Sequence, residues 1–293
     1  MQVSFSQWFQ GIFENFQAVF DVIFAFFTMF GQELLFIVFM GICYWAIDKK
    51  IPIVVGVSAL IASTSNSILK DICKVERPIN DPNVRFVSME NFFVNTEELR
   101  GTYSFPSGHA MWASSLFCSL GLQIKNKKFW FFAIFMIVMV ALSRIYLGVH
   151  WLLDVIVGSL LGFIIAYLVY LLFTKVKEKK IFIFIGLAIF GLIFIFFASS
   201  KDDFSGIGTI LGLSLGVIFE EKIVNFDPKE GTKLKKIFRV IIGFILIFAL
   251  KEGIKYLFNL INPELLFLHT IRYFILSFFA VAIYPLIFKK IKL

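Results

Sequence analysis

A series of long apolar segments, repeated along almost the whole chain, limits what this sequence can fold into. Ten segments can be delimited: residues 17–30, 33–47, 51–73, a fourth beginning near residue 106, then 129–143, 150–173, 181–198, 204–219, 237–260 and 265–288. Several are long enough to cross a bilayer, which takes about 20 apolar helical residues. Hydrophobic residues make up 59% of the chain and charged residues only 16%, so one soluble core could not bury the apolar surface. The sequence predicts an all-α, polytopic membrane bundle with a six-span core and about four further spans.

The basic residues gather in short clusters between the apolar segments. The clusters lie at Lys49–Lys50 and at residues 125–128, 175–180, 229–239 and 289–292. All fall on one side if every segment crosses once, and basic loops are typical of the cytoplasmic side. We therefore predict a cell-membrane protein with both termini cytoplasmic. The net charge of +8 belongs to these loops, and no nucleic acid is expected as a partner.

The basic run near residue 175 is also the best domain boundary. It predicts a core at residues 1–174 and a four-span extension at 175–293. Aromatic and aliphatic residues recur every three or four positions between 5 and 16, which is typical of a helix lying in the membrane interface. The cysteines show no metal-like spacing and are predicted to be small buried hydrophobes; they are Cys43, Cys73 and Cys118.

The first of three polar stretches at helix ends is "KDICKVERP", residues 70–78. Lys70 and Arg77 are nearly two helical turns apart, so they share a face while the helix lasts. Pro78 disfavours helix at the residue before it, so the helix should end near there. Taken alone, these residues are more typical of basic side chains that reach for the membrane interface.

The second stretch is "PSGH", residues 106–109, immediately before an apolar run. Proline suits the first turn of a helix, where backbone amides lack acceptors within the helix. Those amides and the helix dipole favour an anion, and Gly108 would let backbone approach a ligand closely. A Pro-Ser-Gly turn is also a common way to begin a helix.

The third stretch is "SRIYLGVHWLLD", residues 143–154. His150 and Asp154 are four residues apart and lie on one helix face. The aspartate could accept a hydrogen bond from one imidazole nitrogen and leave the other nitrogen available. Arg144 precedes them across a short connection. An Arg–Asp pair that merely joins two helix ends explains this stretch equally well.

The three stretches are more informative together, because the predicted topology places all of them on the extracytoplasmic side. Three cations near one point would repel each other unless an anion with several oxygens lay between them. The guanidinium fork of arginine suits phosphate. We therefore predict a phosphate site, and the two histidines indicate that the phosphate reacts.

These stretches resemble the three signature motifs of the type 2 phosphatidic acid phosphatase superfamily, K-x6-RP, PSGH and SR-x5-H-x3-D. All the specified positions match, in order, and the resemblance covers about residues 17–174. It implies that His150 is a nucleophile forming a phosphohistidine, that Asp154 orients it, and that His109 is the general acid and base. The implied phosphate-binding residues are Lys70, Arg77, Ser107, Gly108 and Arg144.

No metal or other cofactor is expected. Three protein cations already face the phosphate, and the sequence offers no carboxylate cluster for a metal ion. A site beside the apolar phase favours a lipid phosphate or diphosphate, such as a polyprenyl diphosphate carrier, phosphatidic acid or phosphatidylglycerophosphate. The segment "YWAIDKK", residues 44–50, also faintly resembles the sphingosine-phosphate phosphatase branch.

Other functions remain open at this point. The same histidines could pass the phosphoryl group to a lipid or sugar acceptor instead of water. A sugar phosphatase similar to the glucose-6-phosphatases is another possibility. A lipid or anion transporter would move its ligand without hydrolysis and would tolerate loss of His150.

The extension has two features of its own. Glycines recur every four residues in its second span, at Gly208, Gly212 and Gly216, a pattern of close packing within the chain or in a homodimer. Ionisable residues in the outer half of its last two spans are costly at membrane depth. They are predicted headgroup contacts, the alternative being a Lys–Glu pair and basic side chains reaching for the interface: Lys251, Lys255, His269 and Arg272.

Overall fold

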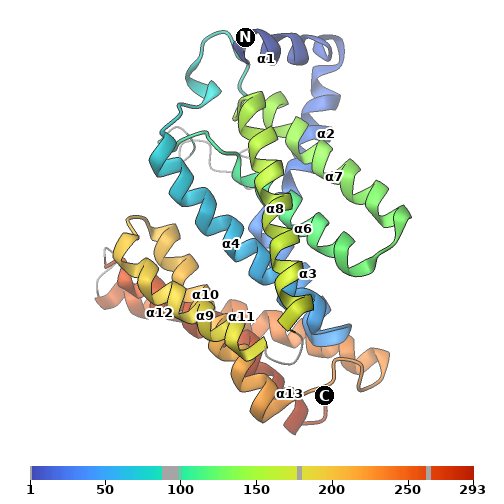
Figure 1. Cartoon of the computed structure of the whole chain (residues 1–293), viewed down its shortest axis with the longest axis vertical. Coiled ribbons are helices and arrows are strands. Elements are labelled where there is room, and N and C mark those ends of the chain that lie inside the picture. The colour runs from blue at the N-terminus through green and yellow to red at the C-terminus, as the bar shows by residue number, and fades with distance from the viewer. Residues whose placement is uncertain (1, 88–98, 100, 177–179, 262–264) are drawn as a thin grey trace. The chain divides into compact units, whose positions relative to one another are not determined.

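The computed structural model describes residues 2–87, 99, 101–176, 180–261 and 265–293, and each of the ten predicted segments is helical (Figure 1). The helices are α1 Gln2–Gly11, α2 Gln17–Met29, α3 Glu33–Ala46, α4 Lys50–Cys73, α6 Gly108–Ile124, α7 Lys127–Tyr146, α8 Leu152–Val176, α9 Lys180–Phe194, α10 Lys201–Phe219, α11 Lys233–Ile261, α12 Phe267–Phe278 and α13 Tyr284–Lys290. The predicted all-α class is confirmed.

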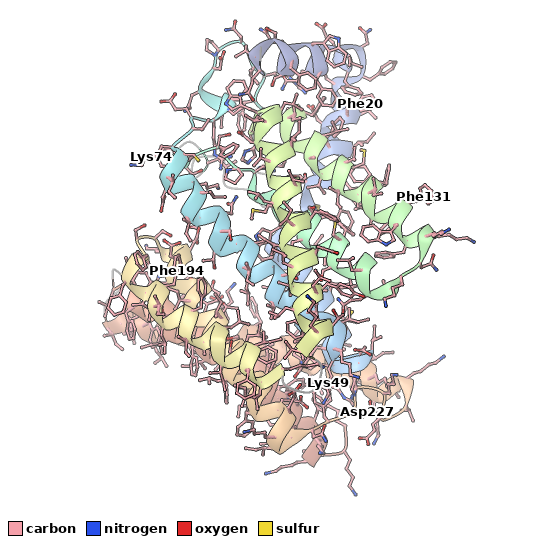
Figure 2. All side chains as sticks on the ribbon, viewed as in Figure 1. Phe20, Lys49, Lys74, Phe131, Phe194 and Asp227 are labelled. Carbon is pink, nitrogen blue, oxygen red and sulfur yellow. The ribbon has the colours of Figure 1, made fainter. Side chains whose placement is uncertain are left out.

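Five helical stretches are long and apolar enough to cross a membrane by themselves: α4, α7, α8, residues 180–197 and residues 267–290. Helices α1 and α2 together make a sixth candidate that is bent by 50°. Large apolar side chains on these helices face outward; Phe131 on α7, for example, is 79% exposed (Figure 2). Such apolar surface needs lipid around it, so this is a multi-pass membrane protein. The count of ten crossings stays a prediction.

The chain forms two compact units. The first contains residues 1–37 and 61–171, and the second contains residues 38–60 and 172–293. Residues 38–60 thus pack with the C-terminal part of the chain although they precede the first polar stretch. These compact units are not the two domains predicted from the sequence, and the domain boundary at residue 174 stays a prediction.

In the first unit, helix α7 packs against α2 and α6. Helix α1 buries Phe9 against the rings of Phe24 and Phe13, while Trp8 beside it is 61% exposed. The prediction that this helix lies in the membrane interface stays a prediction. Helix α1 is also anchored to the third polar stretch, because the Gln10 side chain donates to the carbonyl of Tyr146 at 2.8 Å.

Two glycines of α8 allow this helix to approach α6 at backbone contact. A Cβ at Gly158 would lie 2.6 Å from the carbonyl oxygen of Ser107, and a Cβ at Gly162 would overlap the carbonyl oxygen of Met111. Small residues at four-residue spacing permit this kind of approach. The contact places the first turn of α6, with its histidine, beside the first turn of α8, with its aspartate.

In the second unit, the predicted glycine stripe packs within the chain. Gly208 and Gly212 face the backbone of α12 at Thr270 and Phe274, and a Cβ at either glycine would overlap it. Parallel packing of α10 and α12 therefore depends on these small residues. Gly208 and Gly212 are covered by α12 and so are not free for a second copy of the chain. The homodimer stays a prediction.

The "YWAIDKK" segment also has a structural role in this unit. The Tyr44 hydroxyl donates to the carbonyl of Val281 at 3.1 Å, and the Trp45 indole donates to that of Ala280 at 3.0 Å. Both acceptors lie in a π-helical turn, Phe279–Ile283, where the regular α-helical hydrogen bonds are interrupted. Lys49, labelled in Figure 2, forms a 2.9 Å ion pair with the buried Glu220.

The cysteine prediction is correct for two residues and wrong for the third. Cys43 and Cys118 are buried, but Cys73 is exposed. Cys73 is the last residue of α4, so its side chain lies at the exposed end of the helix.

Candidate active site

The turn between α7 and α8 brings Arg144 and His150 together. It reverses the chain at Gly148, whose φ is +71°, and a Cβ there would overlap the carbonyl oxygen of Arg85. Glycine is therefore required both for the backbone conformation and for the close approach. The amides of Val149 and His150 donate to the carbonyl of Arg144 at 3.2 and 3.3 Å, which folds the turn over the arginine.

The hydrogen bonds of His150 define its tautomer. The guanidinium of Arg77 lies 3.1 Å from Nε2, and because arginine can only donate, Nε2 is the acceptor. The proton of the neutral ring is therefore on Nδ1, which faces Asp154 at 3.5 Å and Ser104 at 3.3 Å. This arrangement leaves a lone pair on Nε2, as a nucleophile needs.

Burial and the surrounding positive charge keep His150 neutral. The side chain is 2% exposed, and burial, together with the charge of Arg77 and the other two cations, holds the pKa of His150 well below its usual value. Burial also lowers the pKa of Arg77 to about 10, so the guanidinium remains charged at neutral pH. The free site thus contains a neutral imidazole beside a cation.

The second polar stretch leads into α6: Gly108 and His109 begin the helix, whereas Ser107 is its N-cap and Pro106 lies before it, not in the first turn as expected. The Ser107 amide donates to the carbonyl of Asp154 at 3.0 Å, and Asn66 on α4 donates to the carbonyl of Pro106 at 3.0 Å. A Cβ on Gly108 would lie 3.2 Å from the amide oxygen of Asn66. These contacts fix the turn that carries His109.

The three cations come from three different segments. Arg77 is positioned by Thr102, which accepts from Nε through its hydroxyl at 3.0 Å and its carbonyl at 3.2 Å. Arg144 donates from Nη1 to the hydroxyl of Thr28 on α2 at 2.6 Å. Lys70, on α4, is a charged neighbour of both His109 and His150. The structure therefore brings the residues of all three predicted stretches together.

Three buried polar atoms of this site have no hydrogen-bond partner among the described residues. They are the hydroxyl of Ser107, Nε2 of His109 and Nε of Arg144. Unsatisfied buried polar groups are costly, and here all three belong to predicted phosphate-binding or catalytic residues. An anion with several oxygens would satisfy the hydroxyl and the guanidinium, and a histidine beside it could exchange a proton.

No group of three or more potential His, Cys, Asp or Glu ligands for a metal ion occurs within the described residues. The expectation of chemistry without a metal stays a prediction. The residues that could hold the phosphate are cations and donors, which suits an anion rather than a metal ion.

The four predicted headgroup residues are dispersed. Lys251 and Lys255 are exposed on α11, His269 is half-buried on α12, and Arg272 is buried. The Nε atom of Arg272 has no partner in the described part of the chain. The charged neighbours of His269 include Arg272 and Lys201, a residue that the sequence analysis did not single out.

Four further residues of the active site were missed from the sequence: Thr28, Asn66, Thr102 and Ser104. Thr102 and Ser104 directly precede the PSGH motif in "TYSFPSGH", so a run of hydroxyl residues was the available signal. Thr28 is the polar residue in the apolar run "AFFTMF", and a lone polar residue in a span is itself a sign of function or of helix contact.

The tautomer and protonation of His150 lead to a direct prediction. A histidine in water is half protonated at about pH 6.5, whereas His150 should remain neutral there, with its proton on Nδ1, because its pKa is depressed. Nitrogen-15 NMR of histidine-labelled protein would test this, since the chain has only three histidines. A His150→Asn variant assigns the signal, and a signal that titrates near pH 6.5 would contradict the structure.

Comparison with known proteins is consistent with this geometry. Residues 52–178 match the sequence family described as the PAP2 superfamily, and residues 204–293 match the family described as the PAP2 superfamily phosphatase, transmembrane extension. The first match contains all three polar stretches. The second lies entirely in the C-terminal extension.

Curated relatives are similar over different lengths. Undecaprenyl-diphosphatase of Sulfolobus acidocaldarius is 34% identical over 145 residues, which cover 49% of this chain and 66% of the relative. Sphingosine-1-phosphate phosphatase 1 of Rattus norvegicus is 27% identical over 264 residues, or 80% of this chain and 59% of the relative. The chain thus spans about three fifths of the length of these relatives.

Among solved structures, the transmembrane PAP2-type phosphatidylglycerolphosphate phosphatase of Bacillus subtilis matches with a TM-score of 0.44 and 25% identity, covering 60% of this chain and 87% of that chain. The two family matches lie in order along most of the sequence, and the motif residues meet in one buried site. The chain belongs to the PAP2 superfamily.

Proposed function

We propose that this chain hydrolyses a lipid phosphate or diphosphate monoester, without a metal, through a phosphohistidine on His150. One observation carries the proposal: a neutral His150 with Nε2 as acceptor lies among three cations, beside buried donors that have no partner in the part of the chain that the structure describes. The relatives named above, an undecaprenyl-diphosphatase and a sphingosine-1-phosphate phosphatase, support a lipid phosphate as substrate.

In the first step, the Nε2 lone pair of His150 attacks phosphorus and the bond from phosphorus to the leaving oxygen breaks. The leaving oxygen takes a proton from Nε2 of His109. Because burial and the three cations keep His109 neutral in the free site, the phosphate monoanion of the substrate supplies this proton to His109 as it binds. The cations at positions 70, 77 and 144 offset charge on the equatorial phosphoryl oxygens. The ring of His150 becomes a cation that keeps its Nδ1 proton, and Asp154 offsets that charge.

In the second step, His109, now neutral, accepts a proton from a water molecule that attacks the phosphohistidine. The phosphorus–nitrogen bond breaks, inorganic phosphate leaves and the Nε2 lone pair of His150 is restored. One histidine thus serves as acid and then as base, as general acid–base catalysis in two half-reactions requires. Ser107 and the Gly108 amide complete the set of donors around the phosphate.

We place this site on the extracytoplasmic face, with both termini cytoplasmic. The catalytic residues lie at the beginning of α6 and the end of α7, whereas the basic loop at residues 125–128 joins the other ends of these helices. Basic loops favour the cytoplasmic side. This separation within the first unit supports the orientation.

We also propose that the ionisable residues of the last two spans contact the lipid headgroup. Arg272 supports this, because it is 9% exposed and its Nε has no partner in the described residues. A basic side chain that merely reached for the interface would be expected at the surface. Lys233 is exposed at the beginning of α11, in the basic cluster predicted to be cytoplasmic, and serves as the comparison.

The decisive experiment measures phosphate release by the purified full chain, with EDTA present and no added metal. The lipids offered are phosphatidic acid, phosphatidylglycerophosphate, undecaprenyl diphosphate and sphingosine 1-phosphate. We expect release from at least one lipid, loss of release in His150→Ala, and weaker selection among headgroups in Arg272→Gln than in Lys233→Gln. Equal selection in these two variants would exclude the headgroup role.

Release that disappears with EDTA would overturn chemistry without a metal. Release that persists in folded His150→Ala would overturn the phosphohistidine. Phosphoenzyme formation without phosphate release, relieved by an added alcohol, would instead identify a phosphotransferase.

A further inference from the structure

The nucleophilic histidine and its aspartate are not directly hydrogen-bonded in this structure. His150 Nδ1 and the Asp154 carboxylate oxygen Oδ2 are 3.5 Å apart, and a side-chain hydrogen bond at such a distance is weak. The hydroxyl of Ser104 lies nearer, at 3.3 Å from Nδ1, and it donates a short hydrogen bond to Oδ2 of Asp154. The same carboxylate oxygen accepts from the Trp151 amide at 2.8 Å.

The donors and acceptors in this chain of groups follow from Arg77, which can only donate. Arg77 donates to Nε2, so the single proton of the neutral ring is on Nδ1. The Ser104 hydroxyl gives its own proton to the carboxylate, so its lone pairs face Nδ1. The resulting sequence of donors runs from the imidazole to the hydroxyl and then to the carboxylate.

Ser104 is held in this place by its backbone and by burial. Its amide donates to the carbonyl of Val75 at 2.7 Å, just before Arg77 in the first polar stretch. Its side chain is fully buried, at 0% exposure. The hydroxyl therefore has little freedom to turn toward other partners, and a buried hydroxyl with both neighbours satisfied is stabilised in one orientation.

We propose that Ser104 is a positioning residue that connects Asp154 to His150 and so stabilises the positive charge that the ring acquires on phosphorylation. The inference rests on the proposed phosphohistidine mechanism. In the free site the hydroxyl orients the imidazole; once Nε2 is bonded to phosphorus, the Nδ1 proton is on a cation and the hydrogen bonds on that side strengthen. Asp154 thus acts largely through Ser104.

Ser104→Ala tests this role with minimal change in volume. We expect kcat to fall about 10- to 100-fold, the effect of losing a hydrogen bond to a charged group, while KM changes little because Ser104 does not face the phosphate. Ser104→Cys should be intermediate, since a thiol is a weaker donor and acceptor. Ser115→Ala is the matched control: Ser115 is also fully buried and its hydroxyl has no partner among the described residues.

A double-mutant cycle separates positioning from general packing. If Ser104 acts through Asp154, Ser104→Ala should cost little further activity in an Asp154→Asn background, because residues that act as a unit are not additive. Full additivity of the two losses, or a Ser104→Ala enzyme as active as Ser115→Ala, would overturn the proposal.

A measurement that does not depend on turnover distinguishes the positioning role of Ser104 from the proposed phosphohistidine reaction. In proton NMR, the Nδ1–H of His150 should give a downfield, slowly exchanging signal that shifts or disappears in Ser104→Ala and persists in Ser115→Ala. An unchanged signal would overturn the positioning role even if the enzyme is active. A changed signal in a chain whose wild type forms no phosphoenzyme would leave the positioning role standing and refute only the proposed reaction.

Discussion

A phosphoenzyme that forms on His150 and then fails to turn over is the expected result for His109→Ala. This variant keeps the nucleophile, its Nδ1 partners and the three cations, but it loses the base for the incoming water. With a substrate whose leaving group needs no proton, such as p-nitrophenyl phosphate, the first step should still proceed. Steady-state turnover should fall roughly 10²- to 10⁴-fold, the usual contribution of general acid–base catalysis.

Rapid quenching with ³²P-labelled substrate would check this prediction. The label should be stable to base and labile to acid, accumulate to about one equivalent per chain in His109→Ala, and be absent from His150→Ala. Wild-type protein should show only a small steady-state amount. Label in the His150→Ala variant, or none in His109→Ala at measurable first-turnover rates, would contradict the roles given to the two histidines.

Gly162→Val is expected to prevent stable folding of the catalytic unit. The added Cβ would overlap the backbone carbonyl of Met111 and lie 2.9 Å from the Cβ of Ser114. Since backbone cannot move aside as a flexible side chain can, α8 would have to separate from α6. Overpacking of this kind costs about 3 kcal/mol or more, and separation of these helices would also part His109 from Asp154.

Thermal unfolding in detergent, followed by circular dichroism, measures this effect. Gly186→Val in α9 is the matched control, because a Cβ at Gly186 meets nothing within 4 Å and the residue is exposed. The control should melt with the wild type. If Gly162→Val unfolds at the same temperature as the wild type and retains activity, the helices α6 and α8 are not in backbone contact at this glycine.

The helices could be predicted because each one carries its own signal. An apolar run bounded by charges or by proline identifies a span regardless of its neighbours, and all ten predicted segments are helical. The association of residues 38–60 with the C-terminal unit carries no such local signal. It depends on contacts such as Trp45 with Ala280, which join residues far apart in the sequence.

The candidate site also contains residues that have a local signal in the sequence and residues that have none. Lys70, His109 and His150 could be singled out because their chemistry and spacing are unusual among apolar residues, and their roles stay predictions. Thr28 and Ser104 could not, because serine and threonine also occur in spans as packing residues or as donors to their own helix. Only the folded chain shows that one hydroxyl holds Arg144 and that the other lies between a histidine and an aspartate.

The hydrogen bond from Arg77 to His150 Nε2 has a consequence for an enzyme surrounded by ester lipids. A ring nitrogen whose lone pair is already engaged attacks a neutral carbonyl poorly, so the acyl esters of nearby phospholipids are not competing reactants. A phosphate offers the guanidinium stronger, charge-assisted acceptors and draws it away from the ring. In the proposed mechanism, His150 therefore becomes reactive only when an anion arrives, and the resting site should leave the acyl esters of the membrane intact.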